Sequence, residues 1–163
     1  FKNGVFMKNN DLFIEKVSYT KALDSLLLLA DPDKNMAAKY INDGDIFVLY
    51  KSGEIIAECV VVKQSDSEYE LKNIAVREDF QNKGFGSRLL EHIFDVYSKK
   101  CSYLIVGTSE SGTGFYEKFG FILYSKRENF FKDNYSEPVY ENGRLCEHMY
   151  MLKKIFTADK TAK

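Results

Sequence analysis

Hydrophobic residues between positions 84 and 100 recur every three or four residues, the spacing that places side chains on one face of an α-helix. A pair of lysines at the end of this segment suits the negative end of the helix dipole. The pattern therefore predicts a long helix over residues 84–100. The residues that carry it are Phe85, Leu89, Leu90, Ile93, Phe94 and Tyr97.

Shorter apolar runs on both sides of this helix have the length and the turn-rich borders of β-strands. Gly53 lies in a polar turn between two such runs, and polar residues 64–67 separate the second run from a third. Residues 46–76 are thus predicted to form three antiparallel strands. Strands are predicted at residues 12–17, 46–50, 55–62, 69–76, 103–107, 121–125 and 145–155, and further helices at residues 22–30, 32–41 and 113–119.

The predicted order of elements is β-α-α-β-β-β-α-β-α-β-β, which indicates one α/β domain over residues 7–156. Residues 126–144 are polar and aromatic with turn signals, and no element is predicted there. Residues 1–6 precede a methionine and are expected to be an added or trimmed start. Residues 157–163 are expected to be a frayed tail.

The composition narrows the classes of function. With 23 basic and 24 acidic residues, interspersed along the chain, there is no basic stripe for nucleic acid. The longest apolar run, residues 26–30, is far too short to cross a membrane. Three separated cysteines favour reduced, mostly buried thiols, and neither His92 nor His148 has a metal-ligand neighbour. We therefore expect a cytoplasmic protein with no metal, no membrane and no nucleic acid as partner.

Glycines open the predicted long helix directly after a strand and a turn. Gly84 and Gly86 do not continue into a dinucleotide fingerprint, because Leu89 stands where the third glycine belongs. Free backbone N–H groups and the positive end of the helix dipole would nevertheless converge on an anion, with Lys83 adding charge. This pattern suits a pyrophosphate. An ordinary strand-to-helix turn explains the same residues equally well.

Two motifs resemble those of the GNAT superfamily of N-acetyltransferases. Residues 71–76, a four-residue gap and then residues 81–90 (QNKGFGSRLL) are similar to its acyl-CoA-binding motif. Residues 115–121 (FYEKFGF) are similar to its downstream motif. The predicted order of elements is also that of the family, so the resemblance covers almost the whole chain and implies a central mixed sheet flanked by helices.

The resemblance implies that acetyl-CoA is the acyl donor and where it binds. Backbone N–H groups of the turn would wrap the pyrophosphate, and the pantetheine arm would pair like an added strand where residues 74–76 splay from residues 103–107. An N–H near Val76 would polarise the thioester carbonyl. Many relatives carry Asn where this chain has Ser109, a departure at one wall of the site. The implied cofactor-binding residues are Ile74, Ala75, Val76, Gln81, Asn82, Lys83, Gly84, Phe85, Gly86, Ser87 and Ser109.

The resemblance also implies catalytic residues. Tyr116 matches the tyrosine that protonates the departing CoA thiolate, and the alternative is a tyrosine that only packs under the sheet. Glu70 aligns with a position from which some relatives supply a general base, and the alternative is a solvated carboxylate. The implied function is transfer of an acetyl group to a primary amine. The rival is a module that binds or senses acyl-CoA without turnover.

The acceptor side is expected around residues 22–41 and 129–142, where the family places it. The second segment combines aromatic and acidic side chains, which suit an amine cation, although an ordinary surface loop has the same composition. Whether the protein forms a homodimer is left open. The aromatic and acidic residues of this segment are Phe130, Phe131, Asp133, Tyr135, Glu137, Tyr140 and Glu141.

Overall fold

The computed structural model describes residues 11–157. The predicted start at residues 1–6, the first four residues of the predicted domain and nearly all of the predicted tail lie outside the described residues. The main sheet contains β1 (Leu12–Val17), β2 (Asp45–Lys51), β3 (Glu54–Lys63), β4 (Glu68–Val76), β5 (Tyr103–Thr108), β6 (Ile122–Arg127) and β9 (Met149–Ile155). The α-helices are α1 (Asp24–Ala30), α2 (Lys34–Ala38), α3 (Phe85–Tyr97), α4 (Thr113–Glu117) and α5 (Phe130–Asn134).

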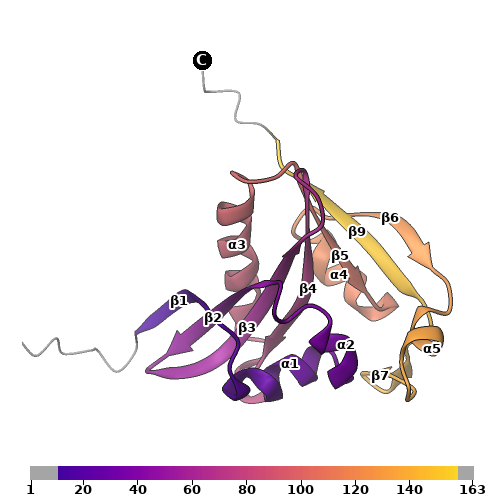
Figure 1. The fold of residues 1–163 in the computed structure, drawn as a ribbon, viewed down its shortest axis with the longest axis horizontal. Helices are drawn as coiled ribbons and strands as arrows, with labels where there is room; N and C mark the ends of the chain where they lie inside the picture. Colours follow the sequence, from indigo (N-terminus) through magenta and orange to yellow (C-terminus); the bar gives the residue numbers. More distant parts are fainter. Residues whose placement is uncertain (1–10, 158–163) are drawn as a thin grey trace, which may run out of the picture.

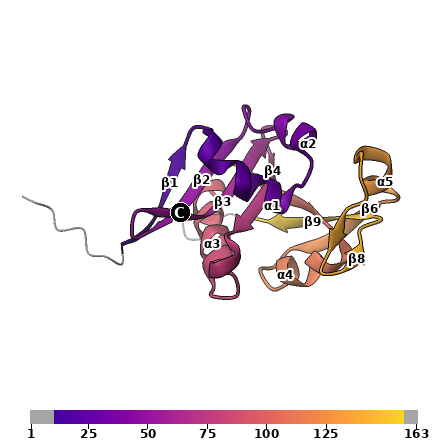
Figure 2. The ribbon, with the colours of Figure 1, turned by 90° about the horizontal axis from the view of Figure 1, so that it is seen from below.

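The strands of the main sheet lie in the order β1-β2-β3-β4-β5-β9-β6. Every neighbouring pair is antiparallel except β4 and β5, which run parallel. Helices α1 and α2 cover one face of the sheet, and α3 and α4 lie on the other (Figures 1 and 2). The predicted α/β class with a mixed sheet between helices is therefore confirmed.

Helix α3 forms because its apolar stripe has a sheet face to cover. Leu89, Leu90 and Ile93 are completely buried in the larger core cluster, which lies between α3 and the strands. Tyr97, the last residue of the helix, is buried too, and its hydroxyl donates to Asp45 Oδ2 at 2.6 Å. Burial of such side chains contributes roughly 1.5–3 kcal/mol each, so this face holds the helix on the sheet.

The segment for which no element was predicted is structured. It contains α5 and a small hairpin of β7 (Tyr140–Glu141) and β8 (Arg144–Leu145). The predicted strand over residues 145–155 was wrong in its first part, because β9 begins only at Met149. We call residues 128–145, which lie between β6 and β9, the inserted segment. Residues 146–148 bond to it instead of joining β9: Cys146 N–H donates to Val139 O, and His148 Nδ1 accepts from the N–H of Asn129.

A bulge in β4 changes the face to which its side chains point. Val60 of β3 faces Asn73, whereas Val61 faces Leu71, so Lys72 is an extra residue in the ladder. Leu71 and Ile74 consequently share the α3 face although they are three residues apart, and Asn73 turns toward α1. The parallel ladder with β5 ends at the pair of Leu71 and Val106. Beyond that pair, β4 continues to Val76 while β5 diverges.

One carboxyl group is buried without a partner. Glu58 on β3 is fully inaccessible, and neither of its oxygens has a hydrogen-bond partner among the described residues. It shares the α1–α2 face of the sheet with Val60. Burial raises the pKa of this carboxyl from 4.5 to about 8, so that the neutral acid is the stable form in the folded protein at neutral pH.

We expect Glu58 to make the folded state less stable as the pH rises from about 4.5 to about 8. In this window the unfolded chain loses the proton while the folded chain keeps it, so the free energy of unfolding falls. At about 1.4 kcal/mol per unit of pKa, the loss amounts to several kcal/mol. Urea unfolding across this window should show a steep slope for the wild type and a shallower one for Glu58→Gln. Equal slopes for the two proteins would show that Glu58 does not titrate in this way.

Candidate active site

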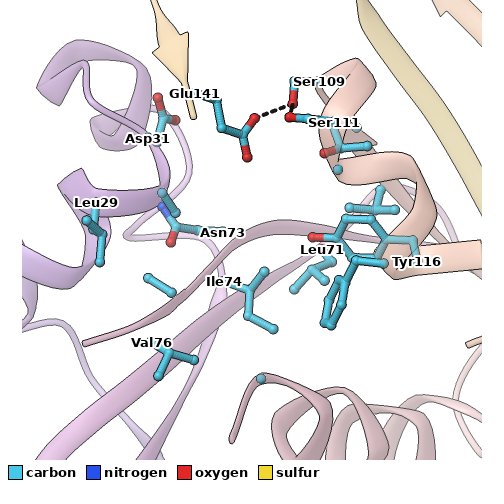
Figure 3. A pocket seen from close by; sticks show the side chains of 18 of the residues that line it. Leu29, Asp31, Leu71, Asn73, Ile74, Val76, Ser109, Ser111, Tyr116 and Glu141 are labelled. Atoms are coloured by element: carbon cyan, nitrogen blue, oxygen red, sulfur yellow. Dashed lines mark hydrogen bonds between the residues drawn. The ribbon is translucent and has the colours of Figure 1, made fainter. Parts of the chain in front are cut away.

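A cavity of about 730 Å³ opens where β4 and β5 separate. Its walls come from the end of α1, the last part of β4, the start of α3, the end of β5, helix α4 and the α5–β7 segment. Figure 3 shows Ile74 and Val76 of β4 on one side and Tyr116 of α4 on another. Segments far apart in the chain thus meet at the place in the sheet where β4 and β5 part.

The start of α3 presents unpaired backbone donors to this cavity. The first helical bond runs from Arg88 N–H to Gly84 O, which leaves the N–H groups of Phe85, Gly86 and Ser87 without an acceptor inside the helix. No side chain caps this end, and the helix dipole adds a partial positive charge. We refer to residues 84–87 as the phosphate cradle, because such a helix start binds phosphate groups.

The two glycines of the phosphate cradle have different roles. Gly84 has a φ of +86°, a left-handed conformation that other residues adopt only with strain. Gly86 is helical, and a Cβ built on it would make ordinary contacts of 3.7 Å with Val76 and 3.8 Å with Phe115. Gly84 is therefore required by the backbone. Gly86 keeps space open in the cavity.

The turn before α3 is braced by side chains. Gln81 Nε2 donates to Val76 O at 2.9 Å and so ties the turn to the end of β4. Asn82 lines the cavity and has a φ of +60°. Lys83 is not among the lining residues; its ammonium donates to Asp79 O at 3.3 Å. It therefore adds positive charge next to the phosphate cradle rather than inside the cavity.

The last residues of β4 offer a free strand edge. Arg77 N–H donates to Ile56 O of β3 at 2.8 Å. Because backbone groups alternate in direction along a strand, those of Ile74 and Val76 point away from β3, toward the gap left by β5. Ile74, Ala75 and Val76 all line the cavity. This edge can accept an extended ligand that pairs with it as a strand would.

Tyr116 is buried beside this edge. It is 7% exposed, and its ring packs edge-to-face on Phe121 at 5.5 Å and on Phe115 at 5.1 Å. Figure 3 shows its hydroxyl directed toward the cavity. Burial, and secondly the charge of Glu141, raise the pKa of the phenol well above its usual value. Tyr116 thus keeps its proton at neutral pH.

Ser109 joins the strand side of the cavity to the inserted segment. Its hydroxyl donates to Glu141 Oε2 on β7, and Ser111 lies at 3.1 Å from the same hydroxyl (Figure 3). Since the proton of Ser109 is used for the carboxylate, Ser111 is the donor of the second bond. The hydroxyl of Ser109 is thus occupied by a contact within the protein, and Glu141 is brought to the cavity.

Two carboxylates differ in their position relative to the cavity: Glu70, a predicted catalytic residue, lies outside it, and Asp31, which was not predicted as a site residue, lies at its wall. Glu70 does not line it: its carboxylate accepts from Gln64 Nε2 at 3.0 Å and pairs with Lys72 at 3.5 Å. Asp31, the residue between the two predicted helices at residues 22–30 and 32–41, does line the cavity. Its signal in the sequence was its place before Pro32, since a residue in that position is extended and ends a helix.

Within residues 11–157 there is no group of three or more His, Cys, Asp or Glu side chains that could hold a metal ion. In the same range, no helix is long and apolar enough to span a membrane.

Comparison with known proteins assigns this fold and cavity to the acetyltransferases. Residues 42–123 match the family model for the acetyltransferase (GNAT) domain. The N-acetyltransferase YvbK of Bacillus subtilis (strain 168), itself uncharacterized, is 34% identical over 138 residues, which are 80% of this chain and 86% of that protein. The chain therefore belongs to the GNAT family of acetyltransferases, and it is an acyl-CoA-dependent enzyme.

Solved structures of similar proteins identify the acyl donor. A GNAT family acetyltransferase from Elizabethkingia anophelis with acetyl-CoA bound has a TM-score of 0.83 and 38% identity, over 91% of this chain and 99% of that chain. An acetyltransferase from Bacillus subtilis in complex with CoA has a TM-score of 0.81 and 32% identity, over 90% of this chain and all of the other. Acetyl-CoA is thus the acyl donor, and the unpaired N–H groups at the start of α3 fit its pyrophosphate.

We expect Gly86→Val to abolish the binding of acetyl-CoA and to leave the fold intact. The valine side chain would fill space that the donor needs, whereas the backbone at this position is helical and carries no strain. Gly114→Val is the matched control, because Gly114 is also helical, has open space around it and does not line the cavity. Calorimetric titration should detect binding to the control and none to Gly86→Val. Equal affinities would remove the assignment of the phosphate cradle.

Proposed function

We propose that this protein transfers an acetyl group from acetyl-CoA directly to a primary amine. One observation supports this most strongly: the buried hydroxyl of Tyr116 and the free edge of β4 face the same cavity, which also receives the phosphate cradle. A thioester paired to that edge would lie within the cavity beside the phenol. The assay is thiol release with a panel of amines, together with the mass change of the acceptor.

The main chain would hold and polarise the donor. The phosphate cradle receives the pyrophosphate, and the pantetheine arm extends along Ile74 and Val76. The N–H of Val76 points into the gap, because Val76 does not use it toward β3. It can therefore donate to the thioester carbonyl, where negative charge develops as the amine attacks.

Tyr116 would supply the proton to the leaving thiolate. A phenol and a free thiol have pKa values of about 10 and 8.5 in water, so the transfer is not strongly uphill. The dry surroundings that raise the pKa of the phenol also raise the proton affinity of a thiolate formed next to it. The phenol therefore stays protonated until the thiolate forms.

Acidic and aromatic side chains suit the acceptor. Tyr135, Tyr140 and Glu141 line the cavity on the side away from the phosphate cradle. Asp133 and Glu137, the other acidic residues expected there, do not line it. A cationic amine would therefore meet Glu141 as it approaches. The cytoplasmic location stays a prediction, and so does the option of a homodimer.

The rival function is a module that binds acyl-CoA without turnover. The two functions share the phosphate cradle and differ in whether an amine reaches the thioester. Thiol release that depends on an added amine, with a matching mass increase of that amine, supports the enzyme. Tight acetyl-CoA binding with no release in the presence of any amine supports the module.

We expect Tyr116→Phe to lower kcat by roughly 100-fold, the effect of a lost proton donor. The substitution keeps the ring and its contacts with Phe121, so acetyl-CoA affinity and Tm should change little. Tyr124→Phe on β6 is the matched control, because it deletes a hydroxyl that is outside the cavity. Steady-state rates measured where chemistry is limiting decide the matter. If kcat is the same for Tyr116→Phe and the wild type, Tyr116 only packs.

We expect Glu141→Gln to raise the KM of a cationic amine by about threefold, the scale of a solvent-exposed charge interaction. The KM of acetyl-CoA should change less, and the effect should shrink at high salt because ions screen the carboxylate. Glu137→Gln removes the same charge outside the cavity and serves as control. An unchanged amine KM in Glu141→Gln would mean that the acceptor does not pass this carboxylate.

A further inference from the structure

Asp31 is placed at the cavity by the way α1 ends. It caps the helix, its N–H donates to Leu27 O at 3.0 Å, and its φ of −133° is extended, as a residue before proline must be. The chain therefore turns away from the helix here. The side chain of Asp31 reaches the cavity wall while the residue as a whole is only 8% exposed.

Two phenols hold the carboxylate of Asp31 in a fixed orientation. Tyr40 donates to Oδ2 at 3.0 Å, and Tyr135 of the inserted segment donates to Oδ1 at 2.9 Å. A carboxylate can accept about four hydrogen bonds, and the backbone of Asp33 also bonds to this one, so it keeps room for at least one more donor. Each phenol donates its only proton to the carboxylate. Asp31 is consequently preorganised to receive further donors.

No cation of the described residues neutralises this carboxylate. None of the ion pairs found within residues 11–157 involves Asp31. Lys72 lies over the ring of Tyr40, 5.6 Å from its centroid, but it pairs with Glu70. A carboxylate that is buried with neutral partners interacts strongly with any cation that enters.

The groups around Asp31 also favour proton uptake. Burial raises the pKa of its carboxyl, the bonds from Tyr135 and Tyr40 oppose this, and the nearby charge of Asp33 raises it further. The net direction of the pKa shift is upward, which makes Asp31 a better proton acceptor than an ordinary aspartate.

Hydrogen bonds connect Asp31 to the strand that would hold the thioester. Asn73 of β4 donates through Nδ2 to the hydroxyl of Tyr40 and to Leu27 O, both at 3.0 Å. Tyr40 in turn donates to Asp31. The carboxylate is thus fixed relative to the β4 residues on either side of Asn73. Figure 3 shows Asp31 and Tyr116 on opposite sides of the cavity. The amine of an acceptor placed between them would lie between Asp31 and the thioester beside Tyr116.

We propose that Asp31 is the residue that binds the ammonium group of the acceptor and removes its proton. This inference rests on the proposed acetyl transfer to a primary amine and names the base for it in place of Glu70. Glu70 is bound by Gln64 and Lys72 outside the cavity, and Glu141 is more exposed and accepts from Ser109. Asp31 alone among these three carboxylates is buried at the cavity wall.

The protons balance in the proposed step. The ammonium ion gives one proton to Asp31, and the neutral amine attacks the carbonyl carbon of the thioester. The C–N bond forms, the C–S bond breaks, and the thiolate takes a proton from Tyr116. The nitrogen releases a second proton, which restores Tyr116, and Asp31 releases the first to solvent. The products are the amide, CoA thiol and one proton.

The test compares acceptors that need a base with acceptors that do not. A primary alkylamine has a pKa of about 10.4 and is charged at neutral pH, whereas aniline and hydroxylamine are neutral there. We expect Asp31→Asn to lower kcat/KM by roughly 100-fold for the best alkylamine of the panel and only a few-fold for the neutral amine. Asp31→Ser, a second neutral replacement, should give the same ratio of the two losses.

The controls separate a chemical role from a structural one. Glu137→Gln removes a carboxylate charge outside the cavity, so both rates should stay near the wild type. A fraction of unfolded protein lowers both rates equally and does not change their ratio. Equal losses for charged and neutral amines would overturn the proposal. If the wild type binds acetyl-CoA but acetylates no amine, the proposed function fails as well.

Discussion

The active site exists because two parallel strands separate. The ladder between β4 and β5 ends at Leu71 and Val106, and the bulge at Lys72 follows at once. A continuous pairing would have used the backbone of Ile74 and Val76 inside the sheet, and the cavity would have no strand edge. The separation also determines which elements can meet: α3 begins where β4 ends, while Tyr116 and Ser109 follow from the diverging end of β5. The rest of the site is arranged around this gap.

The two ends of the cavity are built from different chemical groups. At the proposed donor end, the groups available to a ligand belong to the main chain, namely the N–H groups at the start of α3 and the edge of β4. At the other end they are side chains: the carboxylates of Asp31 and Glu141 and the phenols that surround them. The donor end suits anions and the other end suits cations, so the substrates are oriented by charge along the cavity.

Much of the fold could be predicted from the sequence, because its signals are local. The apolar stripe of α3 and the turns between β2, β3 and β4 depend on neighbouring residues only. The inserted segment could not be predicted in this way. Helix α5 is short. Residues 146–148 pack on this segment rather than extend β9, because of contacts such as that of His148 with Asn129. Asp31 was missed for a related reason: its partner Tyr135 is 104 residues away.

The division between main-chain and side-chain groups has a consequence for how such an enzyme diversifies. Substitutions leave backbone N–H groups in place, so the recognition of CoA tolerates sequence change at most positions of the turn other than the glycines. The opposite wall consists of side chains, which substitutions do change. Replacing Tyr135 or Glu141 therefore alters the surface that an acceptor meets. Both belong to the segment between β6 and β9, which lies beside the sheet (Figure 2) and outside its main core. New acceptor preferences can therefore arise by drift in one segment while the use of a common donor is inherited unchanged.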